Sequence, residues 1–262
     1  MDCSVVATRH KGMVCRWSLN TPCLAPGLFP CVFERAAQYM VSTTDFFYPL
    51  VEDPYMQGRV AACNVLSDVY AMGVVEIDTV LMILGVSKQM TKSEQDIVTT
   101  EMIRGFAGEW SWLHSPGTPL LLTTIFRCWF LVLLADCCRE AGTGCTGGQT
   151  VLNPWPIIGG VANCTVLESE MIRPKHAAPG DVIVLTKPLG TQVAVNLQEW
   201  RRQPANWSRV EAHITHEQVE KAFLDSVDSM ARLNRNGAKL MHKHGAKAAT
   251  DVTGFGILGH LE

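Results

Sequence analysis

The segment RVAACNVLSDVYAMG, residues 59–73, carries the clearest structural signal in the chain. Its apolar side chains recur at the spacing of one helix face, at Ala62, Val65, Leu66, Val69 and Met72. Gly73 is placed to end this helix, because glycine adopts the left-handed conformation of a helix C-terminus without steric cost. Asp68 falls off the apolar stripe, so we expect its carboxylate to face something other than the core.

The segments that follow this helix predict strands and a further helix. Residues 74–86 (VVEIDTVLMILGV) and 156–166 (PIIGGVANCTV) are apolar runs suited to buried strands, and 182–186 (VIVLT) reads as another strand after a turn. A helix is predicted from Thr215, which forms a capping box with Gln218. Helices and strands alternate, so the chain combines α and β structure, while the sheet type stays open.

The composition narrows the class of protein. The 262 residues and 47% hydrophobic content fit a globular protein of one large or two ordinary domains. A net charge of −3 gives no basic surface for nucleic acid, so we expect no nucleic-acid partner. The ten cysteines contain no C-x-x-C pair and the N-terminus has no signal-peptide pattern. We therefore expect reduced thiols and a cytoplasmic location.

Two stretches, about 13–41 and 109–134, lack helical or strand periodicity. The first holds three cysteines and three prolines within residues 13–40. The second contains an apolar run whose length approaches that of a membrane span, but Pro119 and Arg127 interrupt it. We expect no membrane span, and we expect the second stretch to be an exposed apolar appendage.

Four single aspartates stand where a helix or strand meets a loop: Asp2, Asp45, Asp68 and Asp251. Magnesium bound to a nucleotide takes one or two carboxylates together with waters and phosphate oxygens. Separated aspartates suit such a site better than one acidic cluster does. The alternative for each residue alone is a helix N-cap or a solvated surface charge.

Two glycine-containing segments are candidates for phosphate contacts. The first is Gly147, Gly148, Gln149 and Thr150, and the second contains Gly254 and Gly256 after Asp251. A turn at a helix N-terminus presents backbone N–H groups to an anion. Neither segment is a P-loop or a G-x-G-x-x-G motif, so a turn that merely joins two strands remains the alternative.

Taken in order, four segments closely resemble the selenophosphate synthetase (selenide, water dikinase) family of the animal type, within the aminoimidazole ribonucleotide synthetase-like superfamily. They are TTDFFYPLVEDPYMQGRVAACNVLSDVYAMGV, GTGCTGGQTVLNPWPIIGGVA, PGDVIVLTKPLGTQVAVN and AATDVTGFGILGH. The resemblance implies an α+β fold of two domains. Residues 1–170 would form an ATP-binding domain that pairs in a homodimer, and residues 171–262 would begin the C-terminal domain.

The resemblance also implies roles for individual residues. The family's magnesium ligands fall on Asp2, Asp68 and Asp251. Residues matching its nucleotide contacts are Met1, Asp2, Asp45, Asp68, Gly147, Gly148, Gln149 and Thr150. The implied reaction converts ATP, selenide and water into selenophosphate, phosphate and AMP, for selenocysteine synthesis.

The chain also departs from the family pattern. The family's reactive Cys or selenocysteine and its nearby Lys match no residue, because both positions would precede residue 1, so no catalytic residue is assigned. The match ends just past residue 260, and the two unpatterned stretches interrupt it. We therefore expect the 262 residues alone to be impaired or inactive as an enzyme. A non-catalytic nucleotide-binding or dimerising fragment, or another enzyme of the superfamily, remains the alternative.

Overall fold

The structure is a computed structural model that describes residues 4–7, 12–16, 32–36, 38–107 and 136–261. Its centre is a five-stranded mixed sheet with the strand order β1-β4-β7-β5-β6. These strands are β1 (Ser4–Ala7), β4 (Gln38–Phe47), β5 (Thr79–Ser87), β6 (Cys145–Asn153) and β7 (Ile157–Leu167). The β5 and β6 pair is parallel, and the other neighbours are antiparallel. Strands β2 (Gly12–Arg16) and β3 (Val32–Ala36) form a separate antiparallel pair.

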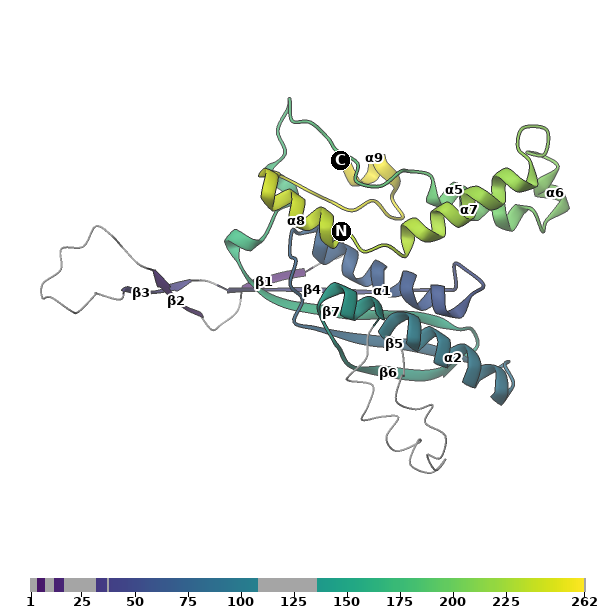
Figure 1. Cartoon of the computed structure of the whole chain (residues 1–262), viewed down its shortest axis with the longest axis horizontal. Helices are drawn as coiled ribbons and strands as arrows, with labels where there is room; N and C mark the ends of the chain where they lie inside the picture. The colour runs from purple at the N-terminus through teal and green to yellow at the C-terminus, as the bar shows by residue number, and fades with distance from the viewer. Residues whose placement is uncertain (1–3, 8–11, 17–31, 37, 108–135, 262) are drawn as a thin grey trace, which may run out of the picture.

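Helices cover this sheet in two further layers. Helix α1 (Pro54–Ala71) contacts β4 and β7, and α2 (Lys92–Ala107) contacts α1 and β5. Figure 1 shows the C-terminal helices on the side of α1 away from the sheet. The remaining helices are α4 (Asp136–Ala141), α5 (Thr191–Trp200), α6 (Pro204–Trp207), α7 (His216–Met230), α8 (Arg235–His244) and α9 (Gly256–Leu261), with short 3-10 turns at Glu168–Glu170 and Pro174–His176.

The side chains of strand β4 alternate between the buried face and the exposed face of the sheet. Val41 and Thr43 point toward α1 and are 0% and 2% exposed, whereas Met40 and Phe46 are 42% and 54% exposed. This alternation follows from the two-residue period of a strand. One face of β4 therefore belongs to the core, and the other presents apolar side chains outward.

Two glycines allow α1 and α2 to pack closely. A Cβ atom on Gly58 would lie 2.1 Å from the backbone oxygen of Met102, and a Cβ atom on Gly105 would lie 1.9 Å from that of Tyr55. Neither distance is compatible with a side chain. The two helices are therefore in contact through their backbones at both positions.

Most of the predicted elements are confirmed. Helix α1 ends at Ala71, and Gly73 follows with a left-handed φ of 76°. The predicted strands within 74–86 and 156–166 are β5 and β7. At the start of α7, Gln218 N donates to Thr215 Oγ1 and Thr215 N donates to Gln218 Oε1, which is the predicted capping box.

Two predictions of local structure are wrong. Residues 182–186 do not form a strand, because no described segment pairs with them and all five are exposed. Residues 146–150 are not a turn, because Thr146 to Thr150 lie inside β6 and pair with β5. Strand β6 ends at Asn153, next to Pro154.

The unpatterned stretches are only partly described. Residues 38–41, at the end of the first stretch, belong to β4, so that stretch joins the sheet before residue 41. The appendage predicted at 109–134 lies outside the described residues. Among the helices that the structure describes, none combines the length and the hydropathy that a membrane crossing requires.

The contact between α1 and α2 generates a stability prediction. Gly105→Ala should lower the free energy of unfolding by roughly 1–3 kcal/mol, because its methyl group overlaps the Tyr55 carbonyl. Gly237→Ala in α8 is the matched control, since its nearest atom, Thr186 Cγ2, is 4.0 Å away. Urea denaturation of both variants measures the difference. Equal stability of the two variants would contradict the close helix packing.

Candidate functional site

The candidate site lies between one face of α1 and the buried face of β4. Asn64, Ser67 and Asp68 share a face of α1, because residues three and four apart are neighbours on a helix. Thr43 and Asp45 share a face of β4, because alternate residues of a strand point the same way. Polar side chains of α1 and β4 therefore meet at the interface between the helix and the sheet.

Two hydrogen bonds connect these faces. Thr43 Oγ1 donates to Asp68 Oδ2 over 2.7 Å, and Asn64 Nδ2 donates to Asp45 Oδ2 over 2.5 Å. The first bond is buried, since Asp68 is 8% exposed. Asp68 is thus neither a helix N-cap nor a solvated surface charge. As predicted, it faces away from the apolar core side chains, toward a polar partner.

Asp251 reaches the same helix face from the C-terminal half of the chain. Ser67 Oγ donates to Asp251 Oδ2 over 2.8 Å, and Asn234 Nδ2 donates to Ser67 Oγ over 3.1 Å. Ser67, the residue before Asp68 on α1, therefore fixes one carboxylate oxygen of Asp251. Of the two predicted ligands, Asp68 lies on α1 itself and Asp251 contacts α1 through Ser67.

One oxygen of this group has no donor. Asp251 Oδ1 is buried and makes no hydrogen bond within the described part of the chain. A buried carboxylate oxygen without a partner is costly, and a cation would satisfy it. The oxygen donors of Asp68 and Asp251 suit a hard ion such as Mg²⁺ rather than a soft metal.

The described residues supply only part of a metal site. Across the described ranges, no group of three or more His, Cys, Asp or Glu residues is arranged to hold a metal ion. The third predicted ligand, Asp2, and the neighbouring Met1 lie outside the described residues. The residues present therefore fit a magnesium ion that takes few protein ligands, with its other positions filled by water and phosphate.

The GGQT segment lies elsewhere in the sheet. Residues 147–150 are exposed on β6, and strands β7 and β5 separate β6 from β4. Gly148 has a φ of 149°, and a Cβ atom there would lie 1.9 Å from Met82 O, so pairing with β5 already requires glycine. Gly147 has no such restriction, since its nearest atom is Leu81 Cδ2 at 3.6 Å. The chain does not bring this segment to Asp68 and Asp251.

Sequence reasoning missed the polar residues that support the aspartates. Asn64 precedes Ser67 by three residues and Asp68 by four, so helical spacing indicated that Asn64 neighbours both on the helix. Thr43 shares its strand face with Asp45, which alternation would have indicated. No local pattern singled out Asn234, because its contact depends on how the C-terminal half packs on α1.

Two family models match the chain. The model of the AIR synthase related protein N-terminal domain matches residues 30–111, and the model of the C-terminal domain matches residues 178–262. The chain belongs to the AIR synthase related family. The two matches follow each other in the order that the resemblance implied, and together they include more than half of the chain.

Within this family, the relatives at 45–48% identity are selenide, water dikinases, which confirms the resemblance. The enzyme of Trypanosoma brucei brucei (strain 927/4 GUTat10.1) is 45% identical over 264 residues, covering 100% of this chain and 55% of that protein. Selenide, water dikinase 2 of Homo sapiens is 48% identical over 243 residues, covering 92% of this chain and 48% of that protein. The chain therefore spans about half the length of these relatives.

A solved structure confirms the fold class. Thiamine monophosphate kinase from Aquifex aeolicus superposes with a TM-score of 0.54 and 16% sequence identity, covering 82% of this chain and 58% of that one. At this identity the likeness concerns the fold alone. The predicted α+β fold of the AIR synthase related family is thus confirmed.

The bond between β4 and α1 generates the second prediction. Thr43→Val keeps the shape of the side chain but removes the donor to Asp68, so stability should fall by about 1–3 kcal/mol. Thr43→Ser keeps the hydroxyl and should recover most of the hydrogen-bond contribution. Chemical denaturation of the two variants separates the bond from the packing. A serine variant no more stable than the valine variant would contradict the role of the hydroxyl.

Proposed function

We propose that this chain supplies the Mg²⁺-ATP site of a selenide, water dikinase, with Asp68 and Asp251 as magnesium ligands. The observation that supports this most is the buried Oδ1 of Asp251, which has no hydrogen-bond partner among the described residues, while Oδ2 accepts from Ser67, the residue before Asp68. Asp2, which matches the family's third ligand, completes the proposed set. The relatives' name, selenide, water dikinase, supplies the reaction class.

The chain's own residues would orient the ligands. The hydroxyls of Thr43 and Ser67 each donate to one carboxylate oxygen, Oδ2, and so leave the second oxygen of Asp251 for the ion. Such supporting hydrogen bonds fix the direction of a ligand and its affinity for the metal. When bound, Mg²⁺ neutralises negative charge on the phosphoryl groups, and this is the main catalytic contribution in phosphoryl transfer.

The proposed nucleotide contacts are Asp45, Met1, Asp2 and Asp68 near the aspartate group, with Gly147, Gly148, Gln149 and Thr150 on β6. Exposure of residues 147–150 leaves their backbone and side chains accessible to a ligand. Asn64 holds Asp45 through a short bond, which fixes that carboxylate on the side of β4 that faces α1. The proposal includes contact of one nucleotide with both sets of residues, those near the aspartates and residues 147–150 of β6.

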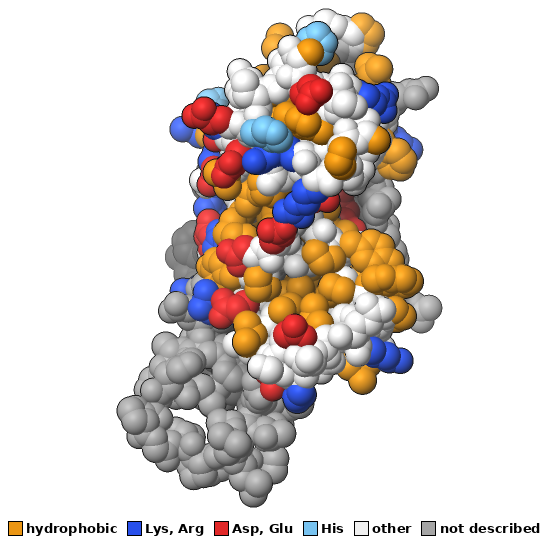
Figure 2. All heavy atoms as spheres, turned by 90° about the vertical axis from the view of Figure 1, so that its right-hand side faces the viewer, with side chains coloured by type: hydrophobic (Ala, Val, Ile, Leu, Met, Phe, Trp, Pro, Cys, Tyr) orange, Lys and Arg blue, Asp and Glu red, His pale blue; other side chains and the backbone are white. Residues whose placement is uncertain are grey.

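A homodimer belongs to the same proposal. Strand β6 is an edge strand, and the exposed apolar side chains of β4 and β6 include Phe46 and Leu152. Beyond the strand ends, Tyr48 and Trp155 meet edge to face with ring centroids 6.3 Å apart, although both are exposed. Figure 2 shows hydrophobic side chains gathered in the middle of one side of the molecule. Pairing of two copies would remove such apolar surface from water.

The proposed overall reaction turns ATP, selenide and water into selenophosphate, phosphate and AMP. The 262 residues contain about half the length of the relatives, so we expect them to bind Mg²⁺-ATP without selenide-dependent turnover. Anaerobic incubation with Mg²⁺-ATP and selenide, followed by AMP assay and phosphorus spectroscopy, tests this expectation against a full-length relative. Selenide-dependent AMP at a comparable rate would overturn the expectation and support a complete active site.

The ligand assignment generates the third prediction. Asp251→Asn and Asp68→Asn should each weaken Mg²⁺-dependent binding of a non-hydrolysable ATP analogue by about tenfold or more, because each loses one charged ligand oxygen. Asp225→Asn is the control, since Asp225 is exposed on α7 and pairs with Lys221. Titration calorimetry with and without Mg²⁺ gives the affinities. An unchanged affinity in both ligand variants would remove the basis for the proposed site.

A further inference from the structure

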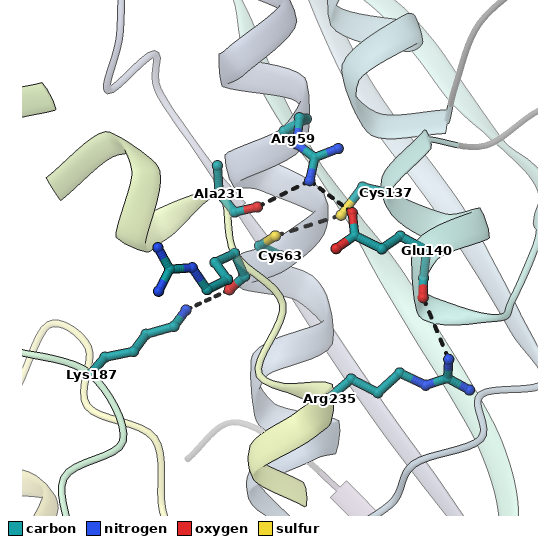
Figure 3. A network of polar contacts seen from close by, with 8 residues as sticks. Arg59, Cys63, Cys137, Glu140, Lys187, Ala231 and Arg235 are labelled. Carbon is teal, nitrogen blue, oxygen red and sulfur yellow. Dashed lines mark hydrogen bonds and ion pairs between the residues drawn. The ribbon is translucent and has the colours of Figure 1, made fainter. Parts of the chain in front are cut away.

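Two buried thiols meet outside the proposed nucleotide site. Cys63 of α1 and Cys137 of α4 lie with their Sγ atoms 3.5 Å apart, and both side chains are buried. The two residues are 74 positions apart in the chain, so the fold rather than the local sequence brings them together. Figure 3 shows the pair at the centre of a network that reaches into the C-terminal half.

Cationic side chains surround the pair. Arg59 Nη2 donates to Glu140 Oε2 over 2.9 Å and to Ala231 O over 3.3 Å, and its charge interacts with Cys137. Lys187 donates to the carbonyls at the end of α7, and its charge interacts with Cys63. Cationic neighbours favour the thiolate, which is the reactive form of cysteine.

The two thiols are not equivalent. The hydrogen bond with Cys63, followed by burial, holds the pKa of Cys137 well above its usual value. The two sulfur atoms share one hydrogen bond in which either could be the donor, and the charge of Lys187 interacts with Cys63. Cys63 is also slightly exposed, whereas Cys137 is fully buried. Cys63 is thus the better nucleophile, and Cys137 is the thiol placed to react next.

We propose that Cys63 and Cys137 form a site of reversible oxidation, at which hydrogen peroxide or a similar peroxide links α1 to α4 by a disulfide. The Cys63 thiolate attacks one peroxide oxygen, the O–O bond breaks, and the released hydroxide is protonated to water. The Cys137 sulfur then attacks the sulfur of the Cys63 sulfenic acid, and the S–O bond breaks. The released hydroxide takes up the proton of the Cys137 thiol and leaves as a second water. Two thiols and one peroxide become one disulfide and two waters.

The other described thiols lack this arrangement. Cys145 donates to Gly147 O over 3.4 Å, and Cys164 donates to Val41 O over 3.6 Å. A disulfide needs its sulfurs at about 2.05 Å, so Cys63 and Cys137 must approach by roughly 1.5 Å. Cys138, which follows Cys137 on α4 and is equally buried, provides a matched control.

The link would act on the proposed site without touching it. Helix α4 leads directly into β6, which carries the GGQT segment, and α1 carries Ser67 one turn after Cys63. Oxidation would join α1 and α4 covalently. In the reduced protein, the ion pair between Arg59 and Glu140 connects these two helices. Because the link closes a long loop in the unfolded chain, the melting temperature should rise by about 5 °C or more.

The test uses the whole 262-residue chain. Reduced protein is exposed to hydrogen peroxide, free thiols are alkylated, and tryptic peptides are analysed without reductant. We expect a linked pair of peptides, residues 60–88 and 128–139, with fragmentation assigning the bond to Cys63 and Cys137. Dithiothreitol should reverse the link and the rise in melting temperature. Cys138→Ser should retain both effects, and Cys137→Ser should lose both.

Three results would overturn the proposal. One is a link that persists in Cys137→Ser, which would place the second sulfur elsewhere. Another is complete alkylation of Cys63 and Cys137 after peroxide has oxidised other cysteines. The third is oxidation of Cys63 to sulfinic acid without a link. Since the last two concern the unsubstituted protein, poor folding of a variant leaves the test intact.

Discussion

Helix α1 lies between the sheet and the C-terminal helices, and it carries three polar side chains, Asn64, Ser67 and Asp68. Placing such groups at these interfaces is costly unless each is hydrogen-bonded. Asp45, Asp251 and Thr43 supply the partners. The rest of the structure depends on this set of contacts, because it fixes α1 on β4, docks the C-terminal half on α1, and fixes one carboxylate oxygen each of Asp68 and Asp251. Stability and ligand placement thus share the same hydrogen bonds.

Features set by neighbouring residues could be predicted from the sequence. The course of α1, its end before Gly73, and the capping box at Thr215 each depend on residues within a few positions. Strand pairing is different, because it depends on which segments the topology makes neighbours. Residues 182–186 have the composition of a strand but no described partner. Gly148 lies in an edge strand, where the backbone of Met82 excludes a side chain.

The candidate site likewise combines residues that local motifs single out with contacts that only the fold creates. Motifs that resemble the family's singled out Asp68 and Asp251, but the contact of Asp251 with Ser67 could not be predicted, because 184 positions separate these two residues. The pairing of Cys63 with Cys137 is likewise invisible in the sequence, where no spacing motif connects them. In both cases the packing of distant segments on α1 determines which residues are in contact.

We propose that the carboxylates of Asp68 and Asp251 bind one divalent cation at the nucleotide site. A crystal structure with Mn²⁺ in place of Mg²⁺ and with a non-hydrolysable ATP analogue tests it directly, because anomalous scattering locates the metal. We expect a peak within about 2.5 Å of Asp251 Oδ1 and of an Asp68 oxygen, in contact with the phosphates. A peak bound to the nucleotide but remote from both carboxylates would contradict it.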